Sequence, residues 1–127
     1  MRRVLLILVF CLLVTGCVSQ KQNNVTPRAT NCSYSKVEVY FYYSPYCPHC
    51  ERVLPYINEL REKYRDVKWI YCNVSGNVSK ACYKYAYYVV GTPTVVVHYG
   101  NVTLSLVGER DVMGLEKVIK SLACCER

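Results

Sequence analysis

The sequence predicts an α/β domain with the element order β-α-β-α-β-β-α, in which helices flank a mixed four-stranded sheet. Residues 36–43, "KVEVYFYY", form an almost continuous apolar and aromatic run, which is typical of a strand buried on both faces. A helical pattern and a second strand-like run follow it, and a strand–helix–strand connection places its strands in parallel. Residues 92–108 then contain two β-rich runs joined by Gly100-Asn101, which indicates an antiparallel hairpin.

The first predicted helix extends from Cys50 to Tyr64, and Pro55 within it is expected to kink it. Its apolar residues recur at helical spacing: Val53, Ile57, Leu60 and Tyr64. The second strand is expected at residues 67–72, "VKWIYC", and a short helix at 80–88, "KACYKYAYY".

Alternation in the second strand of the hairpin predicts one apolar face, formed by Val102, Leu104 and Leu106. Asp111 is expected to cap a last helix. The apolar stripe of that helix would consist of Val112, Leu115, Val118 and Leu122.

The N-terminal segment has the pattern of an export signal. Two arginines precede the apolar run "VLLILVFCLLVT", which ends at Gly16-Cys17 and is too short to span a membrane well. "LLVTGC" resembles the lipobox of prokaryotic lipoproteins, which implies cleavage before Cys17 and lipidation of its thiol. An ordinary secretory signal and an uncleaved anchor are the alternatives. We therefore expect a signal peptide at 1–16, a polar, flexible tether at 17–34 and a folded domain at 35–127.

Asparagine usage also indicates export. Five of the seven asparagines begin an Asn-x-Ser/Thr sequon, whereas the composition predicts about 0.8 by chance; they are Asn24, Asn31, Asn73, Asn77 and Asn101. A lipobox together with many sequons suits a glycoprotein on the extracytoplasmic face of a prokaryotic cell membrane, and an archaeal cell surface would fit both features. The net charge of +7 is scattered along the chain, so no nucleic-acid partner is indicated.

The motif "YCPHC" carries the chemistry of the predicted domain. Cys47 falls where the first helix should begin, and the free N–H groups and dipole of a helix N-terminus stabilise a thiolate. Cys50, one turn later and facing inward, can attack a mixed disulfide formed by Cys47 and resolve it. A metal site is an alternative, with Cys124-Cys125 supplying two further thiolates, and so is a purely structural bridge. We favour the redox couple, with no cofactor.

Residues 37 to 124 resemble the thioredoxin superfamily. The C-x-x-C motif, Pro55 five residues after its second cysteine, the "VVGTPT" loop and the closing hairpin and helix carry the resemblance. It implies that Pro93 is a cis proline beside the dithiol, and that Thr92 and Pro93 offer backbone groups to an extended substrate. Tyr46 is also expected to touch the substrate.

Pro48-His49 matches the Cys-Pro-His-Cys motif of DsbA-type disulfide oxidases, which implies that these two residues tune the couple towards oxidation. Two departures from the family patterns stand out. Residues 65–90 leave no room for the helical insertion of DsbA, and Phe41 stands where many thioredoxins carry a buried acidic residue. Proton transfer to and from Cys50 must therefore take another route.

The remaining cysteines predict structural disulfides. Cys72 and Cys82 flank one loop and are expected to pair. In the thioredoxin-like fold the last helix ends near the start of the first strand, which puts Cys32 within reach of Cys124 or Cys125 and leaves one thiol over.

The sequence thus predicts an exported, lipid-anchored thiol–disulfide oxidoreductase. Its partners would be cysteine-containing exported proteins and a membrane redox partner that resets the dithiol. Oxidation is favoured over reduction or isomerisation. A non-catalytic surface module, stapled by disulfides or binding a metal, is the alternative from another class.

Overall fold

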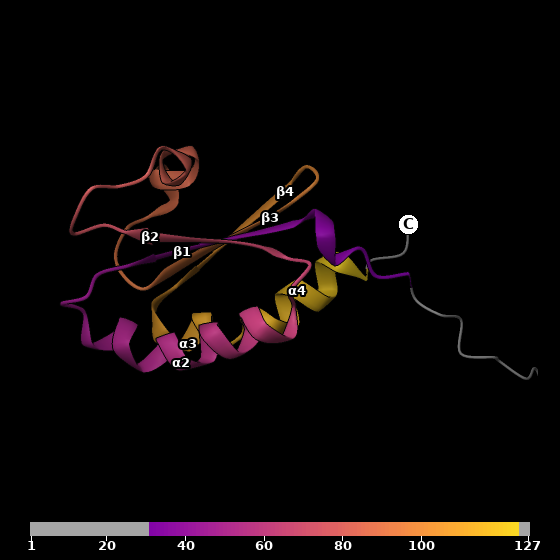
Figure 1. The fold of residues 1–127 in the computed structure, drawn as a ribbon, viewed down its shortest axis with the longest axis horizontal. Helices are drawn as coiled ribbons and strands as arrows, with labels where there is room; N and C mark the ends of the chain where they lie inside the picture. Colours follow the sequence, from indigo (N-terminus) through magenta and orange to yellow (C-terminus); the bar gives the residue numbers. More distant parts are fainter. Residues whose placement is uncertain (1–30, 125–127) are drawn as a thin grey trace, which may run out of the picture.

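The computed structural model describes residues 31–124 of the 127-residue chain, which form a four-stranded sheet with helical segments on both faces (Figure 1). The order of strands and helices confirms the predicted thioredoxin-like α/β fold. The elements in chain order are η1 (Tyr34–Lys36), β1 (Val37–Tyr43), α2 (Pro48–Lys63), β2 (Lys68–Asn73), η2 (Lys80–Tyr88), β3 (Thr94–Tyr99), β4 (Val102–Val107), α3 (Gly108–Val112) and α4 (Leu115–Ala123).

The strands lie in the order β2-β1-β3-β4, so β1 is central, as its apolar sequence predicts. It pairs in parallel with β2 and antiparallel with β3, and β4 pairs antiparallel with β3. Gly100 makes the hairpin turn with φ of 59°, a left-handed conformation that favours glycine. Tyr42 is opposite Thr94, so the loop before β3 lies beside the end of β1, where the C-x-x-C segment begins.

Each face of the sheet has its own core. Helices α2, α3 and α4 lie on one side and η2 on the other (Figure 1). Successive β1 side chains point to opposite faces. Val39 and Phe41 pack on the side of α2 and α4, whereas Tyr40 and Tyr42 pack with Cys82 of η2. This double coverage explains why β1 carries almost no polar residue.

Helix α2 begins at Pro48, directly after Cys47 at the predicted helix start, and continues past Pro55 to Lys63. Its buried side chains Val53, Ile57 and Leu60 are three of the four predicted for the apolar stripe, and Tyr64 is the buried C-cap residue. Pro55 lacks a backbone N–H, yet α2 continues on both sides of it.

The predicted last helix is two helices, and the prediction that Asp111 caps it is wrong. Asp111 lies within α3, and its carbonyl accepts the N–H of Gly114 at 2.9 Å, where α4 begins anew. A Cβ on Gly114 would lie 3.1 Å from that carbonyl, so glycine suits this close turn. The buried stripe is Val112, Leu115, Ile119 and Ala123, while Val118 and Leu122 are only partly buried.

Two further details differ from the sequence prediction. The segment η2 is a 3₁₀ helix, in which residues three apart share a face. Cys82 and Tyr85 accordingly point into the core with Tyr88 packed beside them. In β4 the predicted apolar face is largely exposed at Val102 and Leu104, because β4 is an edge strand.

Two disulfides tie the fold together. Cys72 at the end of β2 is bonded to Cys82 of η2. Cys32, just before η1, is bonded to Cys124 at the end of α4, and the adjacent Ser33 N–H donates to the Ala123 carbonyl at 2.8 Å. The sequence left open whether Cys32 pairs with Cys124 or Cys125, and the structure selects Cys124. Cys125 lies outside the described residues.

Candidate active site

Cys47 is the N-cap residue of α2. Its backbone is extended (φ −101°, ψ 110°), and Pro48 follows as the first helical residue, where a missing N–H costs nothing. The Cys50 N–H donates to Cys47 Sγ at 3.2 Å, so the thiol occupies the position of an N-cap acceptor. Ser44 shapes the preceding turn, since its carbonyl accepts the Cys47 N–H and its Oγ accepts the Tyr46 N–H.

The loop before β3 forms the other wall of the site. The Thr92–Pro93 peptide bond is cis, which confirms the prediction for Pro93. Cys47 Sγ lies 3.4 Å from the Thr92 carbonyl oxygen. The Pro93 carbonyl accepts the N–H of Gly108 at 2.8 Å, which joins this loop to the start of α3. The structure thus brings together Cys47, Thr92 and Pro93.

The two thiols differ in environment and in acidity. Cys47 is partly exposed, whereas Cys50 is buried with 2% of its surface accessible. Partial burial opposes ionisation of Cys47, but hydrogen bonds from the Cys50 side chain and from the N–H groups of Cys50 and His49 lower its pKa. Burial and the neighbouring Cys47 raise the pKa of Cys50. Cys47 is therefore the more acidic and more accessible thiol, and Cys50 the less acidic, buried one.

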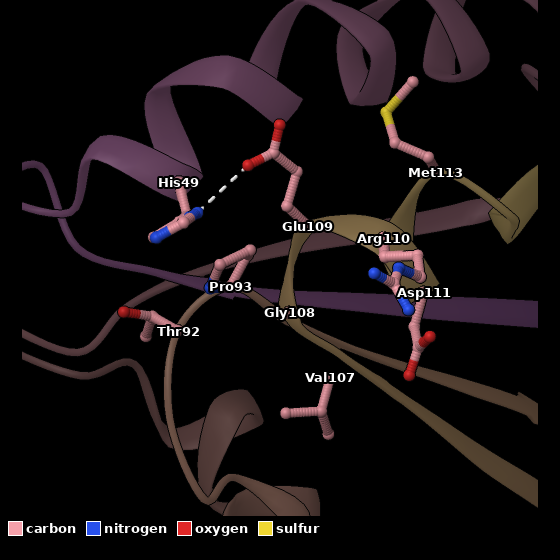
Figure 2. A pocket seen from close by; sticks show the side chains of 9 residues that line it. All are labelled: His49, Thr92, Pro93, Val107, Gly108, Glu109, Arg110, Asp111 and Met113. Carbon is pink, nitrogen blue, oxygen red and sulfur yellow. Dashed lines mark hydrogen bonds and ion pairs between the residues drawn. The ribbon is translucent and has the colours of Figure 1, made fainter.

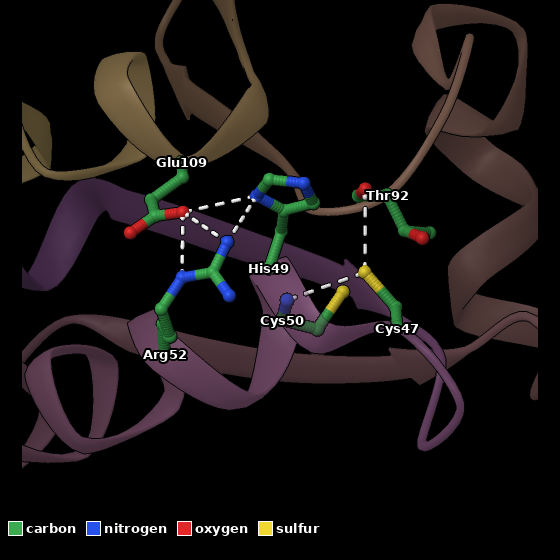
Figure 3. Close-up of polar contacts among 6 residues, drawn as sticks. All are labelled: Cys47, His49, Cys50, Arg52, Thr92 and Glu109. Atoms are coloured by element: carbon green, nitrogen blue, oxygen red, sulfur yellow. Dashed lines mark hydrogen bonds and ion pairs between the residues drawn. The ribbon is translucent and has the colours of Figure 1, made fainter.

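His49 belongs to a cluster that sequence reasoning missed. Its ring nitrogen Nδ1 lies 3.0 Å from Glu109 Oε2, and Arg52 contacts both residues (Figure 3). The Arg52 guanidinium, the largest cause, holds the pKa of the Glu109 carboxyl down to about 2. The i, i+3 spacing of His49 and Arg52 was visible in the sequence. Glu109, 60 residues from His49 and on another helix, had no comparable signal.

A groove of about 700 Å³ runs beside the dithiol between the Thr92–Pro93 loop and α3 (Figure 2). The groove is lined by both polar and apolar residues, among them His49, Thr92, Pro93, Val107, Glu109 and Met113. Tyr46 is not part of the lining and points into solvent with 86% of its surface exposed. The Thr92 and Pro93 side of the groove adjoins Cys47, because Cys47 Sγ lies 3.4 Å from the Thr92 carbonyl oxygen.

Phe41 is fully buried, and its side chain offers Cys50 no proton carrier. Among residues 31–124, no three side chains of His, Cys, Asp or Glu are grouped as metal ligands would be. Cys124, which the metal hypothesis needed, is bonded to Cys32.

An N-capping, ionisable cysteine backed by a buried second thiol and flanked by a cis-proline loop, on this sheet, defines a domain of the thiol–disulfide oxidoreductase class. The family model described as Thioredoxin matches residues 21–121, and the chain belongs to the thioredoxin family.

Solved thioredoxin structures share this fold. Thioredoxin O2 of Arabidopsis thaliana, in its oxidised state, is 30% identical over 70% of this chain and 76% of its own, with a TM-score of 0.57. A variant thioredoxin of Halobacterium salinarum is 25% identical over 72% of this chain and 79% of its own (TM-score 0.58). Mitochondrial thioredoxin 3 of Saccharomyces cerevisiae, 24% identical over 73% of this chain and 83% of its own (TM-score 0.55), is similar in fold. A comparison with curated proteins finds no match.

Several predicted features lie outside the described residues: the signal peptide, Cys17 with its lipobox and the sequon at Asn24. None of the helices within residues 31–124 is both long and apolar enough to cross a membrane.

Proposed function

We propose that the protein is an exported, lipid-anchored thiol–disulfide oxidoreductase that exchanges a Cys47–Cys50 disulfide with cysteines of exported proteins, preferentially oxidising them. The observation that carries the proposal is the asymmetry of the two thiols. Cys47 is accessible and its pKa is lowered, whereas Cys50 is buried and its pKa is raised. This asymmetry supports Cys47 as the nucleophile and Cys50 as the resolving thiol.

In the oxidising direction, a substrate thiolate attacks Cys47 Sγ, the accessible sulfur of the Cys47–Cys50 disulfide. That bond breaks, a mixed disulfide forms, and Cys50 leaves as a thiolate that takes up a proton. A second substrate thiolate then attacks the substrate sulfur of the mixed disulfide, and Cys47 leaves as a thiolate. The substrate loses two electrons, which the Cys47 and Cys50 pair retains.

The substrate segment would lie in the groove beside the Thr92–Pro93 loop, where backbone groups can pair with an extended chain. The exposed ring of Tyr46, next to Cys47 in the chain, offers an apolar contact for the same segment.

Two observations bear on direction. A stabilised Cys47 thiolate favours the reduced dithiol and so makes the disulfide a stronger oxidant, and the Pro48-His49 pair of DsbA-type oxidases fits this. The matching solved structures, however, are thioredoxins, which favours a reductase as the second candidate. An oxidase would need a membrane redox partner to reoxidise Cys47 and Cys50, which suits a lipid anchor at Cys17 on the extracytoplasmic face of a prokaryotic membrane.

The reduction potential of the Cys47–Cys50 couple tests the direction. A value near about −120 mV supports the oxidase and one near about −270 mV the reductase. Turnover of a reduced, unfolded disulfide protein tests the enzyme itself, with Cys47→Ala as the inactive control. One equivalent of bound zinc and no turnover would instead identify the non-catalytic module.

A further inference from the structure

His49, Arg52 and Glu109 form a closed cluster on the groove side of Cys47, two residues from α2 and one from α3 (Figure 3). Glu109 Oε2 accepts from Arg52 Nε at 2.9 Å and lies 2.8 Å from Arg52 Nη2 and 3.0 Å from His49 Nδ1. Arg52 Nη2 lies 2.6 Å from the same His49 nitrogen. One ring nitrogen therefore faces a carboxylate and a guanidinium together.

The guanidinium restricts the protonation of that nitrogen. Arginine nitrogens only donate hydrogen bonds, so the 2.6 Å contact with Arg52 Nη2 calls for a lone pair on His49 Nδ1, whereas the 3.0 Å contact with Glu109 Oε2 would call for an N–H there. The shorter contact favours the lone pair. The proton of a neutral ring then resides on Nε2. Glu109 Oε2 accepts from Arg52 Nε and forms an ion pair with Nη2 of the same guanidinium, which holds that group in place and balances its charge.

We infer that Arg52 and Glu109 are positioning residues that fix His49 as its Nε2–H tautomer, so that a ring N–H faces the dithiol and supports Cys47 when it leaves as a thiolate. In Figure 3 the second ring nitrogen of His49 lies on the side of Thr92 and Cys47, away from Glu109. The inference rests on the proposed function, because only a leaving thiolate gains from this N–H.

The fold explains how Glu109 reaches α2. It is the second residue of α3, directly after Gly108, whose φ of 82° suits glycine and whose N–H donates to the Pro93 carbonyl. The same hydrogen bond that attaches the cis-proline loop to α3 therefore sets Glu109 beside His49 and Arg52.

The tautomer can be read directly from the ¹⁵N chemical shifts of the imidazole, at pH 9, where an ordinary imidazole is neutral. The chain has two histidines, and His98→Gln identifies the signals of His49. We expect the Nε2–H pattern in the reduced wild-type protein and a mixture of tautomers in Arg52→Met. Glu109→Ala, which releases the guanidinium, should also give a mixture. The side chains of Arg52 and Glu109 are 51% and 36% exposed, so both variants should fold.

The redox consequence is measured by equilibrating each protein with glutathione. Arg52→Met should lower the equilibrium constant for reduction of the Cys47–Cys50 disulfide at least about threefold, or about 14 mV. Arg65→Met is the matched control, since Arg65 lies beyond the end of α2 and pairs with Glu62, so its loss should change neither the His49 tautomer nor the constant.

A changed tautomer together with a lowered constant in Arg52→Met supports the inference. An unchanged tautomer overturns it, even if the constant falls, because charge alone would then explain the fall. A changed tautomer with an unchanged constant overturns it as well. Absence of wild-type turnover would contradict the proposed function independently of this inference, since the tautomer is observed without a substrate.

Discussion

Cys50 donates its backbone N–H to the sulfur of Cys47 at 3.2 Å, so the resolving residue also stabilises the Cys47 thiolate, whose sulfur it attacks once Cys47 has formed a mixed disulfide. The first turn of α2 therefore gives the two cysteines of the couple opposite accessibility and opposite shifts in pKa. The first is capped by helix N–H groups at the surface, and the second is buried one turn along the helix. The spacing of two residues is what allows both conditions at once.

Cys50→Ala should trap substrates covalently. Cys47 keeps its access and its helix N–H partner, so attack continues, but the buried thiol that resolves the mixed disulfide is gone. We expect adducts approaching one per protein molecule with a disulfide-containing peptide, seen by mass spectrometry without reductant. Cys47→Ala is the control and should form almost none, because Cys50 is buried. Adducts on Cys47→Ala and none on Cys50→Ala would reverse the assigned roles.

Alkylation of the reduced protein should follow the lowered pKa of Cys47. The thiolate is the reacting form, so the alkylation rate with iodoacetamide should reach half its plateau at a pH below about 8.5, which is the ordinary pKa of a free cysteine. Cys50, whose pKa is raised and which is buried, should stay unmodified at neutral pH. Peptide mapping after timed labelling measures both sites. A half-plateau at pH 8.5 or above would remove thiolate stabilisation from the mechanism.

The sequence predicts best where a local pattern fixes the structure. The order of strands and helices along the chain follows from the apolar runs, and the cis peptide before Pro93 from the resemblance to thioredoxins. The features that the sequence did not predict depend on contacts between segments that are distant in the chain. Glu109 reaches His49 only because α3 starts beside α2, and Asp111 has the side chain of a cap but lies within a helix that ends early. Exposure in β4 likewise depends on its place at the sheet edge, which alternation of residues does not reveal.

The free energy of unfolding of the domain should depend on pH through the Glu38 carboxyl. Lys68 donates to it at 2.8 Å, and Tyr40 and Lys84 also donate, so its pKa is lowered to about 2. A lowered carboxyl pKa stabilises the fold above the unfolded value of about 4.3 and loses that contribution as pH falls towards 2. Glu38→Gln should therefore reduce the free energy of unfolding by about 1–2 kcal/mol at pH 7 and by little at pH 2.

Urea unfolding at the two pH values measures this difference. Glu62→Gln is the matched control, because Glu62 and Arg65 are 70% and 80% exposed and such a pair contributes less than about 1 kcal/mol. A Glu38→Gln effect that is equally large at pH 2 and pH 7 would show that packing, not charge, explains it.

The two disulfides should contribute unequally to stability. In the loop-entropy picture the Cys72–Cys82 bond, with a separation of 10 residues, stabilises by about 2–3 kcal/mol. The Cys32–Cys124 bond, with a separation of 92, should contribute about 4–5 kcal/mol in the same picture. Replacing each pair by alanine and comparing the free energies of unfolding in denaturant tests the order. A larger loss from the Cys72 and Cys82 pair would show that its packing against Tyr42 and Val96 outweighs loop closure.

Cys17→Ser should release the protein from the membrane without changing its redox chemistry. If "LLVTGC" acts as a lipobox, cleavage before Cys17 makes this thiol the lipid-bearing N-terminus, and a serine cannot form the thioether. In a prokaryotic host that processes lipoproteins, we expect the wild-type protein in the membrane fraction. The Cys17→Ser protein should leave that fraction or stay unprocessed, and its purified domain should keep the wild-type potential, because Cys47 and Cys50 are untouched. Cys11→Ser is the matched control: Cys11 lies within the predicted signal, so its loss should leave anchoring intact. Mass spectrometry of the N-terminal peptide decides the case, and an unmodified Cys17 or a mature start elsewhere would contradict lipid anchoring.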